Sequence, residues 1–257
     1  HFARRWFALP QNKGQQQVRS TLSAPLQQFA VYTLQKHLRE LQGRNVEDGA
    51  LVVLDNASGE ILAWVGSSGS MSQAAEVDGV TALRQPGSTL KPFLYAQAIA
   101  ERRITAASLI EDSSAQIATQ NGLYIPQNYD RRFKGWVSVR SALASSRNVP
   151  AVRTLVMVTP DAFFAQLQRL GMPLRESGGY YGYSLALGSA EVQLLQLSNA
   201  YRALANSGQW RPVSWALKNA APPPAAASAS KAGGTKNKAA KAPLGDDSNS
   251  AASVAPV

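Results

Sequence analysis

The chain has 257 residues, 45% of them hydrophobic, which is enough for one large domain or two small ones with a sizeable core. It contains no cysteine, so disulfides, thiolate nucleophiles and cysteine-based zinc sites are excluded. The formal net charge of +10 at pH 7 favours acidic partners, yet no cluster of aromatic residues interleaved with Lys and Arg resembles a nucleic-acid platform, and we expect no nucleic-acid partner.

The N-terminal part predicts a linker, a helix and a β-hairpin. Residues 1–20 are polar and glutamine-rich and are expected to form the linker. Ser23 is a candidate N-cap, a proline fits the first turn after it, and Gly43 would end the helix. The apolar runs 49–55 and 60–65 are separated by a turn, which predicts two strands of an antiparallel sheet.

The rest of the chain predicts helices, one long loop and a tail. Residues 111–136 are rich in turn signals, and we expect a functional or flexible loop there. Helices are expected over 138–143, 159–170 and 189–206, each beginning at a Ser or Thr cap. Residues 213–257 hold Ala, Pro, Ser and Lys with little to bury, which predicts a disordered, low-complexity tail. Helices clustered after a hairpin favour an α+β fold, with helices packed on a mostly antiparallel sheet.

Ser88 and Lys91 are the candidate reactive pair. Pro86-Gly87 marks a turn, and the apolar run 90–100 predicts a buried helix whose first turn holds both residues. Residues three apart share a helix face, so the lysine amine can reach the serine hydroxyl. The helix start also directs N–H groups and the positive end of the helix dipole at Ser88, which suits the oxyanion formed when a carbonyl is attacked.

Lysine is the candidate base because histidine is scarce. Only His1 and His37 could supply imidazole, and His37 fits a solvated or half-buried helix position. The sequence therefore offers almost no histidine for a Ser-His-Asp relay. The Ser-x-x-Lys spacing alone is weak evidence, since a second match, residues 228–231, lies in the predicted tail. Alternatively, Ser88 is a helix cap and Lys91 an ordinary solvated residue.

A second motif gives the pair its context. Ser146-Arg147-Asn148 is the only Ser-x-Asn in the chain, and with Gly87-Ser88-Thr89-Leu90-Lys91-Pro92 it resembles the first two motifs of the serine acyltransferases that penicillin inhibits. The similarity runs over residues 21–212, and residues 77–83 are most like the 1C type. Other stretches also resemble the transpeptidase domain of class A penicillin-binding proteins: Asn128-Tyr129-Asp130, Gly135-Trp136-Val137, Arg140-Ser141-Ala142-Leu143, Asn148-Val149-Pro150-Ala151-Val152, Leu185-Ala186-Leu187-Gly188 and residues 199–206.

The resemblance implies a serine β-lactamase/transpeptidase-like fold and a D,D-transpeptidase that cross-links peptidoglycan stem peptides. Ser88 would be acylated by a terminal D-Ala-D-Ala, Lys91 would be its general base, and Ser146 would pass the proton to the leaving D-alanine. Asn148 would bind the substrate's peptide carbonyl. β-Lactams would be covalent inhibitors, and neither a cofactor nor a metal is expected.

The resemblance also implies a place in the bacterial periplasm, with the parent protein anchored in the inner membrane. The chain begins with His1, without an initiator Met, a leader or an apolar run long enough to span a bilayer. We therefore expect a piece of a longer protein, with its anchor and the glycosyltransferase half of a class A protein upstream.

The third motif of the family, Lys-Thr/Ser-Gly, does not occur in the sequence. Lys231-Ala232-Gly233 lacks the hydroxyl, and we interpret it as a coincidence. In the family this motif lies on a strand that supplies the second oxyanion donor and binds the substrate carboxylate. Loss of one oxyanion donor typically slows a reaction by about 10²–10³. We therefore expect a C-terminally incomplete domain with impaired catalysis.

Several alternatives stay open. The chain could be a non-catalytic remnant that binds muropeptide or a wall-assembly partner. A β-lactamase is a weaker reading, because no base for rapid deacylation is identified. Ser146 and Asn148 could merely cap a helix at Pro150. The basic run 131–134 could attract an acidic stem peptide or be a solvated surface, and the tyrosines at 180–183 fit packing better than substrate contact.

Overall fold

The computed structural model describes residues 1–12, 14, 19–119 and 122–215 of the chain. The helices are α1 (Phe2–Ala8), α2 (Ala24–Glu40), α3 (Lys91–Ala100), α4 (Val139–Ala144), α5 (Asn148–Val158), α6 (Pro160–Arg169), α7 (Gly178–Tyr181) and α8 (Leu194–Ala205). The strands are β1 (Leu51–Leu54), β2 (Ile61–Val65), β3 (Leu109–Asp112), β4 (Ile117–Thr119), β5 (Gly122–Tyr124) and β6 (Gly135–Ser138). Short 3₁₀ turns are η1 (Pro10–Asn12), η2 (Gly69–Met71), η3 (Gly87–Leu90) and η4 (Gly182–Leu187).

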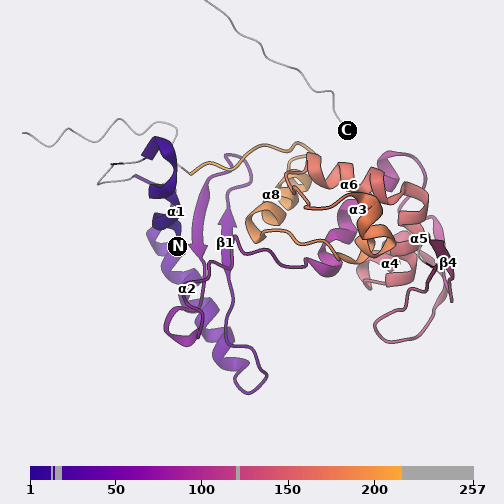
Figure 1. Ribbon diagram of the computed structural model, residues 1–257, viewed down its shortest axis with the longest axis horizontal. Helices are drawn as coiled ribbons and strands as arrows, with labels where there is room; N and C mark the ends of the chain where they lie inside the picture. The colour runs from indigo at the N-terminus through magenta and orange to yellow at the C-terminus, as the bar shows by residue number, and fades with distance from the viewer. Residues whose placement is uncertain (13, 15–18, 120–121, 216–257) are drawn as a thin grey trace, which may run out of the picture.

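The elements form two groups (Figure 1). Helices α1 and α2 lie beside the β1–β2 hairpin, and we call these four elements the hairpin lobe. Helices α3 to α8 gather at the other end, and we call this group the helical lobe. In the described residues the strands pair as three two-stranded antiparallel sheets, β1–β2, β3–β6 and β4–β5. Helices with antiparallel strands confirm the predicted α+β class. None of the helices in this part of the chain is both long and apolar enough to cross a bilayer.

The predicted hairpin is confirmed, and α2 covers it. Leu51 lies opposite Val65 in the register. Ala30 of α2 packs with Ala63 and Val65 in a small buried cluster. Gln27 also bonds the strand backbone, since its amide accepts from Trp64 N at 2.7 Å and donates to Trp64 O at 2.9 Å. Because the side chain of Gln27 satisfies both backbone groups, α2 is tied to the outer edge of β2.

The prediction of a linker over residues 1–20 is wrong for its first part. Residues 2–8 form α1, and Phe2 and Trp6 are both 7% exposed. The Phe2 ring lies 5.9 Å from Trp64 and 5.5 Å from Trp215, measured between centroids. Burial of two aromatic side chains four residues apart outweighs the polar residues around them, because each removes a large apolar area from water.

The predicted start of the tail at Val213 is too early. Ser214 N donates to Gly59 O at 2.8 Å, and Ile61 N donates to Ser214 O at 3.1 Å, so this segment pairs beside the start of β2. Val213 and Trp215 pack against the core of the hairpin lobe. Residues 216–257, which include the rest of the predicted tail, lie outside the described residues.

The helical lobe has the main core, built around α3 and α5. Phe93, Leu94 and Leu155 are at most 1% exposed, and they pack with Phe163 of α6. Thr159 caps α6 as predicted, with its hydroxyl accepting from Ala162 N at 3.4 Å. This core fixes the ends of α3 and α5 that carry the two sequence motifs.

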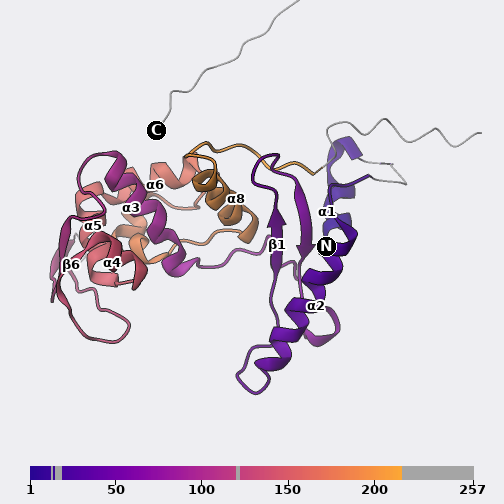
Figure 2. The same cartoon turned by 180° about the vertical axis from the view of Figure 1, so that it is seen from behind.

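The long loop predicted over 111–136 is wrong in part, because strands β3 to β6 occupy much of this region. β3 pairs with β6 with Glu111 opposite Trp136, and β4 and β5 form a small hairpin. Figure 2 shows β6 beside α4 and α5. Ser138 caps α4 as predicted, since its hydroxyl accepts from Ser141 N at 3.2 Å.

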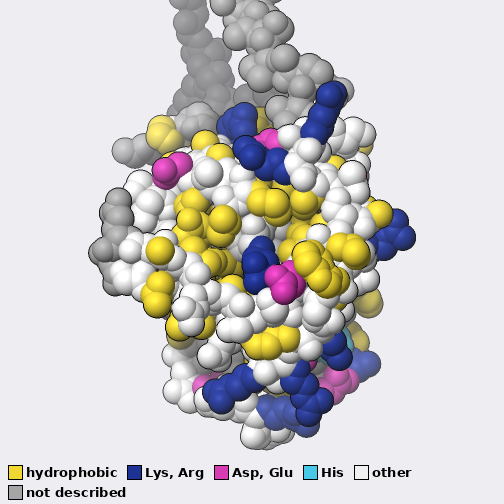
Figure 3. Space-filling view, turned by 90° about the vertical axis from the view of Figure 1, so that its right-hand side faces the viewer, with side chains coloured by type: hydrophobic (Ala, Val, Ile, Leu, Met, Phe, Trp, Pro, Cys, Tyr) yellow, Lys and Arg dark blue, Asp and Glu magenta, His cyan; other side chains and the backbone are white. Residues whose placement is uncertain are grey.

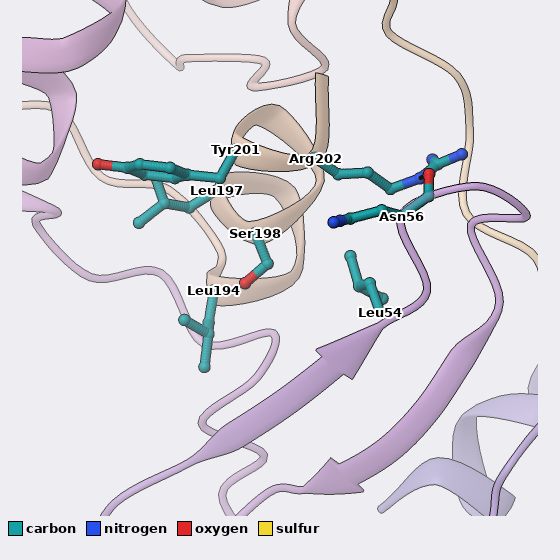
Figure 4. A pocket seen from close by; sticks show the side chains of 7 residues that line it. All are labelled: Leu54, Asn56, Leu194, Leu197, Ser198, Tyr201 and Arg202. Carbon is teal, nitrogen blue, oxygen red and sulfur yellow. Dashed lines mark hydrogen bonds between the residues drawn. The ribbon is translucent and has the colours of Figure 1, made fainter. Parts of the chain in front are cut away.

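Helix α8 contacts both lobes and begins later than expected. Its N-cap is Gln193, which forms a capping box with Gln196, whereas the predicted cap Ser189 bonds Ser184 at 2.8 Å. A hollow of about 390 Å³ separates α8 from β1 and is lined by Leu54, Asn56, Leu194, Leu197, Ser198, Tyr201 and Arg202 (Figure 4). Arg202 is the one cation in this lining, and it donates to Asn56 O at 2.9 Å, which joins α8 to the hairpin.

Candidate active site

Ser88 and Lys91 lie at the junction of η3 and α3. Lys91 is the first residue of α3, and its backbone N–H donates to Ser88 O. The sequence predicted one α-helical turn; the structure has a 3₁₀ turn, in which side chains three apart eclipse each other. Ser88 is exposed, and within the described residues its hydroxyl has no hydrogen-bond partner. The serine is therefore accessible at the mouth of a buried helix.

The Lys91 side chain is fully buried although it is a lysine. Its amine donates to Ser146 O at 2.7 Å, Asn148 Oδ1 at 2.7 Å and Ser146 Oγ at 3.2 Å. Burial lowers the pKa of Lys91 from 10.5 to about 8, because desolvation disfavours the ammonium. About a tenth of such amines are neutral at pH 7, against fewer than one in a thousand for a free lysine.

Ser146 lies in the turn between α4 and α5, as the sequence predicted. Its φ of 50° is in the left-handed region, and its backbone N–H donates to Leu143 O at 2.9 Å. Arg147 N also turns back, to Ala142 O, at 2.9 Å. This tight closure of α4 directs both the carbonyl and the hydroxyl of Ser146 at the Lys91 amine. A left-handed non-glycine residue costs about 1–2 kcal/mol, which the surrounding bonds offset.

Asn148 is the first residue of α5 and joins the same cluster. Its Nδ2 donates to Gln127 O at 2.9 Å while its Oδ1 accepts from Lys91. These two contacts fix the orientation of the amide. The alternative in which Asn148 only caps α5 does not hold, because its side chain bonds Lys91 and Gln127 instead. The structure thus brings together three of the four predicted residues, Lys91, Ser146 and Asn148, one turn from the fourth, Ser88.

Sequence reasoning missed Asn128 as a site residue. Asn128 Oδ1 accepts from the backbone N–H of Asn148 at 2.9 Å and of Val149 at 3.3 Å, so it caps α5 from another segment. A small hollow of about 170 Å³ lies between this segment and the Ser146 turn, lined by Asn128, Tyr129, Asp130, Ser145, Ser146 and Arg147. The signal for this contact in the sequence was a pair of asparagines, Asn128 before the second motif and Asn148 within it.

The η3 turn is held from two sides. Tyr201 of α8 donates its hydroxyl to Thr89 O at 2.7 Å, and its ring stacks edge-on against Phe93 at 4.9 Å. Gly188, with φ +76°, lies against the backbone of Gly87, where a Cβ would overlap the Gly87 nitrogen and oxygen. These contacts place Ser88 by packing, independently of the lysine.

The other residues considered as possible substrate contacts lie outside the cluster of Lys91, Ser146 and Asn148. Arg131, Arg132 and Lys134 are exposed, as a solvated charge run would be. Tyr180 is 72% exposed, whereas Tyr181 and Tyr183 pack against the core. No group of three or more His, Asp or Glu side chains suited to a metal ion occurs in residues 1–12, 14, 19–119 and 122–215.

A larger groove of about 860 Å³ opens at the end of the helical lobe, where Leu109, Trp136 and Val156 are exposed beside an Arg153–Glu111 pair at 3.6 Å. Figure 3 shows this end, with hydrophobic side chains gathered around basic and acidic ones. Neither motif residue Ser88 nor Lys91 lines this groove.

The description of the matching family model is "Penicillin binding protein transpeptidase domain", and the match covers residues 49–241. The chain belongs to the penicillin-binding protein transpeptidase family. The match begins after the first predicted helix and runs past Pro212, where we expected the resemblance to end. The stretch 216–241 lies outside the described residues, as does the chance Ser-x-x-Lys match at 228–231.

Curated relatives place this transpeptidase domain with class A proteins. Penicillin-binding protein 1C of Escherichia coli (strain K12) is 38% identical over 163 residues, covering 62% of this chain and 21% of the relative. Penicillin-binding protein 1A of Neisseria meningitidis (serogroup A) is 34% identical over 163 residues, covering 62% of this chain and 20% of the relative. The higher identity to the 1C protein agrees with the predicted type. The chain spans about a fifth of the length of these relatives.

Solved structures show the same fold. Penicillin-binding protein 1A from Haemophilus influenzae superposes with a TM-score of 0.59 at 30% identity, covering 66% of this chain and 25% of that one. PonA1 of Mycobacterium tuberculosis, solved in complex with penicillin V, superposes with a TM-score of 0.63 at 22% identity, covering 77% of this chain and 54% of that one. The second likeness concerns the fold alone.

Proposed function

We propose that this domain is a penicillin-binding D,D-transpeptidase unit that acts on peptidoglycan stem peptides through an acyl-Ser88 intermediate. The single observation that supports this most strongly is the buried Lys91 amine, which contacts both Ser146 and Asn148 and has a pKa lowered to about 8. An ordinary solvated lysine would have neither the contacts nor the shift.

In the proposed reaction Lys91 Nζ takes the hydroxyl proton of Ser88 as the Ser88 oxygen attacks the carbonyl of the penultimate D-alanine. The backbone N–H of Ser88, in the first turn of η3, would donate to the developing oxyanion. Ser146, whose hydroxyl lies 3.2 Å from the amine, would return the proton to the nitrogen of the leaving D-alanine as the peptide bond breaks. An amine of a neighbouring stem would then take the acyl group from Ser88. Asn148 would orient the substrate's peptide bond.

We further propose that catalysis is impaired in the chain as it stands. The sequence holds no Lys-Thr/Ser-Gly, so the second oxyanion donor and the cation for the substrate carboxylate have no counterpart in it. This same observation favours the second candidate function, a non-catalytic remnant that binds muropeptide or a wall-assembly partner. In either case we place the domain in the bacterial periplasm as part of a membrane-anchored protein.

A long incubation with fluorescent penicillin tests the proposal. We expect slow formation of a covalent adduct, and mass spectrometry of the digested protein should place it on the peptide that carries Ser88. An adduct on Ser146 or on the second Ser-x-x-Lys match would contradict the nucleophile assignment. Complete absence of an adduct would favour the non-catalytic remnant, and rapid stoichiometric labelling would show that the third motif is dispensable.

The pH dependence of labelling tests the role of Lys91. The base must be neutral, and with a pKa of about 8 the neutral fraction rises from pH 6 to pH 9. Labelling should therefore accelerate about tenfold per pH unit below the pKa and level off above it. Rates measured with a penicillin that is stable over this range, with fluorescence after electrophoresis as the readout, give the midpoint. A flat profile, or a midpoint near 10.5, would exclude Lys91 as the base.

A further inference from the structure

A buried polar chain runs behind the candidate site and is anchored at Asp112. Asp112 is fully buried and Asn128 is 4% exposed. Asn128 Nδ2 donates to Asp112 Oδ1 at 2.6 Å and to Arg132 O at 2.9 Å. On its other side, Asn128 Oδ1 accepts from the first two backbone N–H groups of α5, those of Asn148 and Val149. Every polar atom of the Asn128 side chain is therefore used.

We propose that Asn128 is a positioning residue for the site: through its cap on α5 it holds Asn148 and Ser146 against the Lys91 amine. The consequence for acylation rests on the proposed function above, whereas the consequence for the surroundings of Lys91 does not. Asn128 touches neither Ser88 nor Lys91, so it acts through the helix end.

Asparagine suits this position because its side chain lies between two partners with opposite hydrogen-bonding requirements. The helix start needs an acceptor, and the buried carboxylate needs donors; one amide offers both. Asp112 Oδ2 also accepts from Lys134 N at 3.1 Å and lies 3.8 Å from Arg147 Nε. Besides Asp112 itself, two charged or titratable side chains lie near Asp112 and Asn128. One is Arg147, which also bonds Asp130 at 3.0 Å, and the other is the buried hydroxyl of Tyr95.

Asn199 provides a matched control for the loss of a buried asparagine. It is 6% exposed, its Nδ2 donates to Arg211 O at 3.0 Å, and its Oδ1 accepts from Arg202 at 3.0 Å. Asn199 is on α8, in a network that makes no contact with Lys91. Asn128→Ala and Asn199→Ala should both lower stability, but only Asn128→Ala should disturb the Lys91 amine.

The first measurement is the pKa of Lys91 itself, followed by NMR of lysine-labelled protein and assigned by the signal lost in Lys91→Arg. In Asn128→Ala the start of α5 is released and water reaches the amine, so the burial that lowers the pKa of Lys91 is relieved and the pKa should rise from about 8 toward 10.5. In Asn199→Ala it should match wild type. An unchanged or lowered pKa in Asn128→Ala, or an equal rise in Asn199→Ala, would overturn the inference.

Asn128→Asp is the conservative variant and keeps the test decisive if Asn128→Ala does not fold. An Asp at this position keeps an acceptor for α5 but replaces the amide donor to Asp112 by an oxygen at hydrogen-bond distance. Its penicillin labelling rate should be at least about tenfold below that of wild type, because Asn148 and Ser146 are no longer held against the amine. Asn199→Asp, at the control position, should label at the wild-type rate.

Wild-type labelling by folded Asn128→Asp, or an equal loss in Asn199→Asp, would overturn the inference. Failure of the proposed function would look different, because wild type would then carry no adduct on Ser88. In that case the pKa of Lys91 in Asn128→Ala and Asn199→Ala still decides the role of Asn128.

Discussion

Lys91→Met should slow penicillin acylation of Ser88 by at least about a hundredfold, because a positioned general base contributes about 10²–10⁴ to such a step. Methionine has a similar length and an apolar tip, so it fills the same buried space without an amine. Labelling rates at pH 8.5 or so, where about three quarters of the wild-type amines are neutral at a pKa of about 8, give the largest contrast. Ser88→Ala sets the background level of non-specific labelling.

Loss of function in Lys91→Met should not reflect loss of fold. The variant removes a desolvated amine, which favours folding, and leaves Ser146 O and Asn148 Oδ1 without their donor, which opposes it. We expect a net change within about 1 kcal/mol, or about 2–4 °C in the thermal midpoint. Lys36→Met, at a position where the side chain is 56% exposed, is the control for the substitution itself. Near wild-type labelling in a folded Lys91→Met protein would rule out the lysine as base.

The sequence predicts those parts of the fold that depend on neighbours along the chain. Ser138 and Thr159 cap the helices that follow them, because capping needs only the next three residues. The spacing of Ser88 and Lys91 likewise predicted that both residues lie in one turn at the start of a helix, although the turn is 3₁₀. The resemblance to a family then supplied Ser146 and Asn148, which no local pattern connects to Lys91.

What the sequence did not predict depends on contacts between distant segments. The cap of α5 is Asn128, twenty residues before the helix, so no local capping signal could identify it. Residues 2–8 fold because Trp64 and Trp215 are present to cover Phe2, and a polar composition alone does not reveal that partner. The strands within 111–136 are short and flanked by turns, so their pairing with one another decides their structure.

Gly188→Ala should destabilise the domain by about 2–5 kcal/mol, the sum of about 1–2 kcal/mol for a left-handed backbone and about 1–3 kcal/mol for overlap with its neighbours. Gly188 has φ +76°, and a Cβ there would meet the backbone of Gly87, which cannot rotate away as a side chain could. Gly87 directly precedes Ser88, so any relief of the overlap on the Gly87 side moves the η3 turn. Equilibrium unfolding in urea measures the first effect, and labelling of the folded protein measures the second.

Gly43→Ala separates the two causes. Gly43 has φ +80°, but a Cβ at this position would meet nothing within 4 Å, so the variant should show only the backbone cost of about 1–2 kcal/mol. Its labelling rate should stay at the wild-type level, since the Gly87 backbone is undisturbed. If Gly188→Ala proves no more destabilising than Gly43→Ala, the close contact does not support the serine turn. A folded Gly188→Ala protein that labels normally would show that the position of Ser88 is set by α3 and Tyr201 instead.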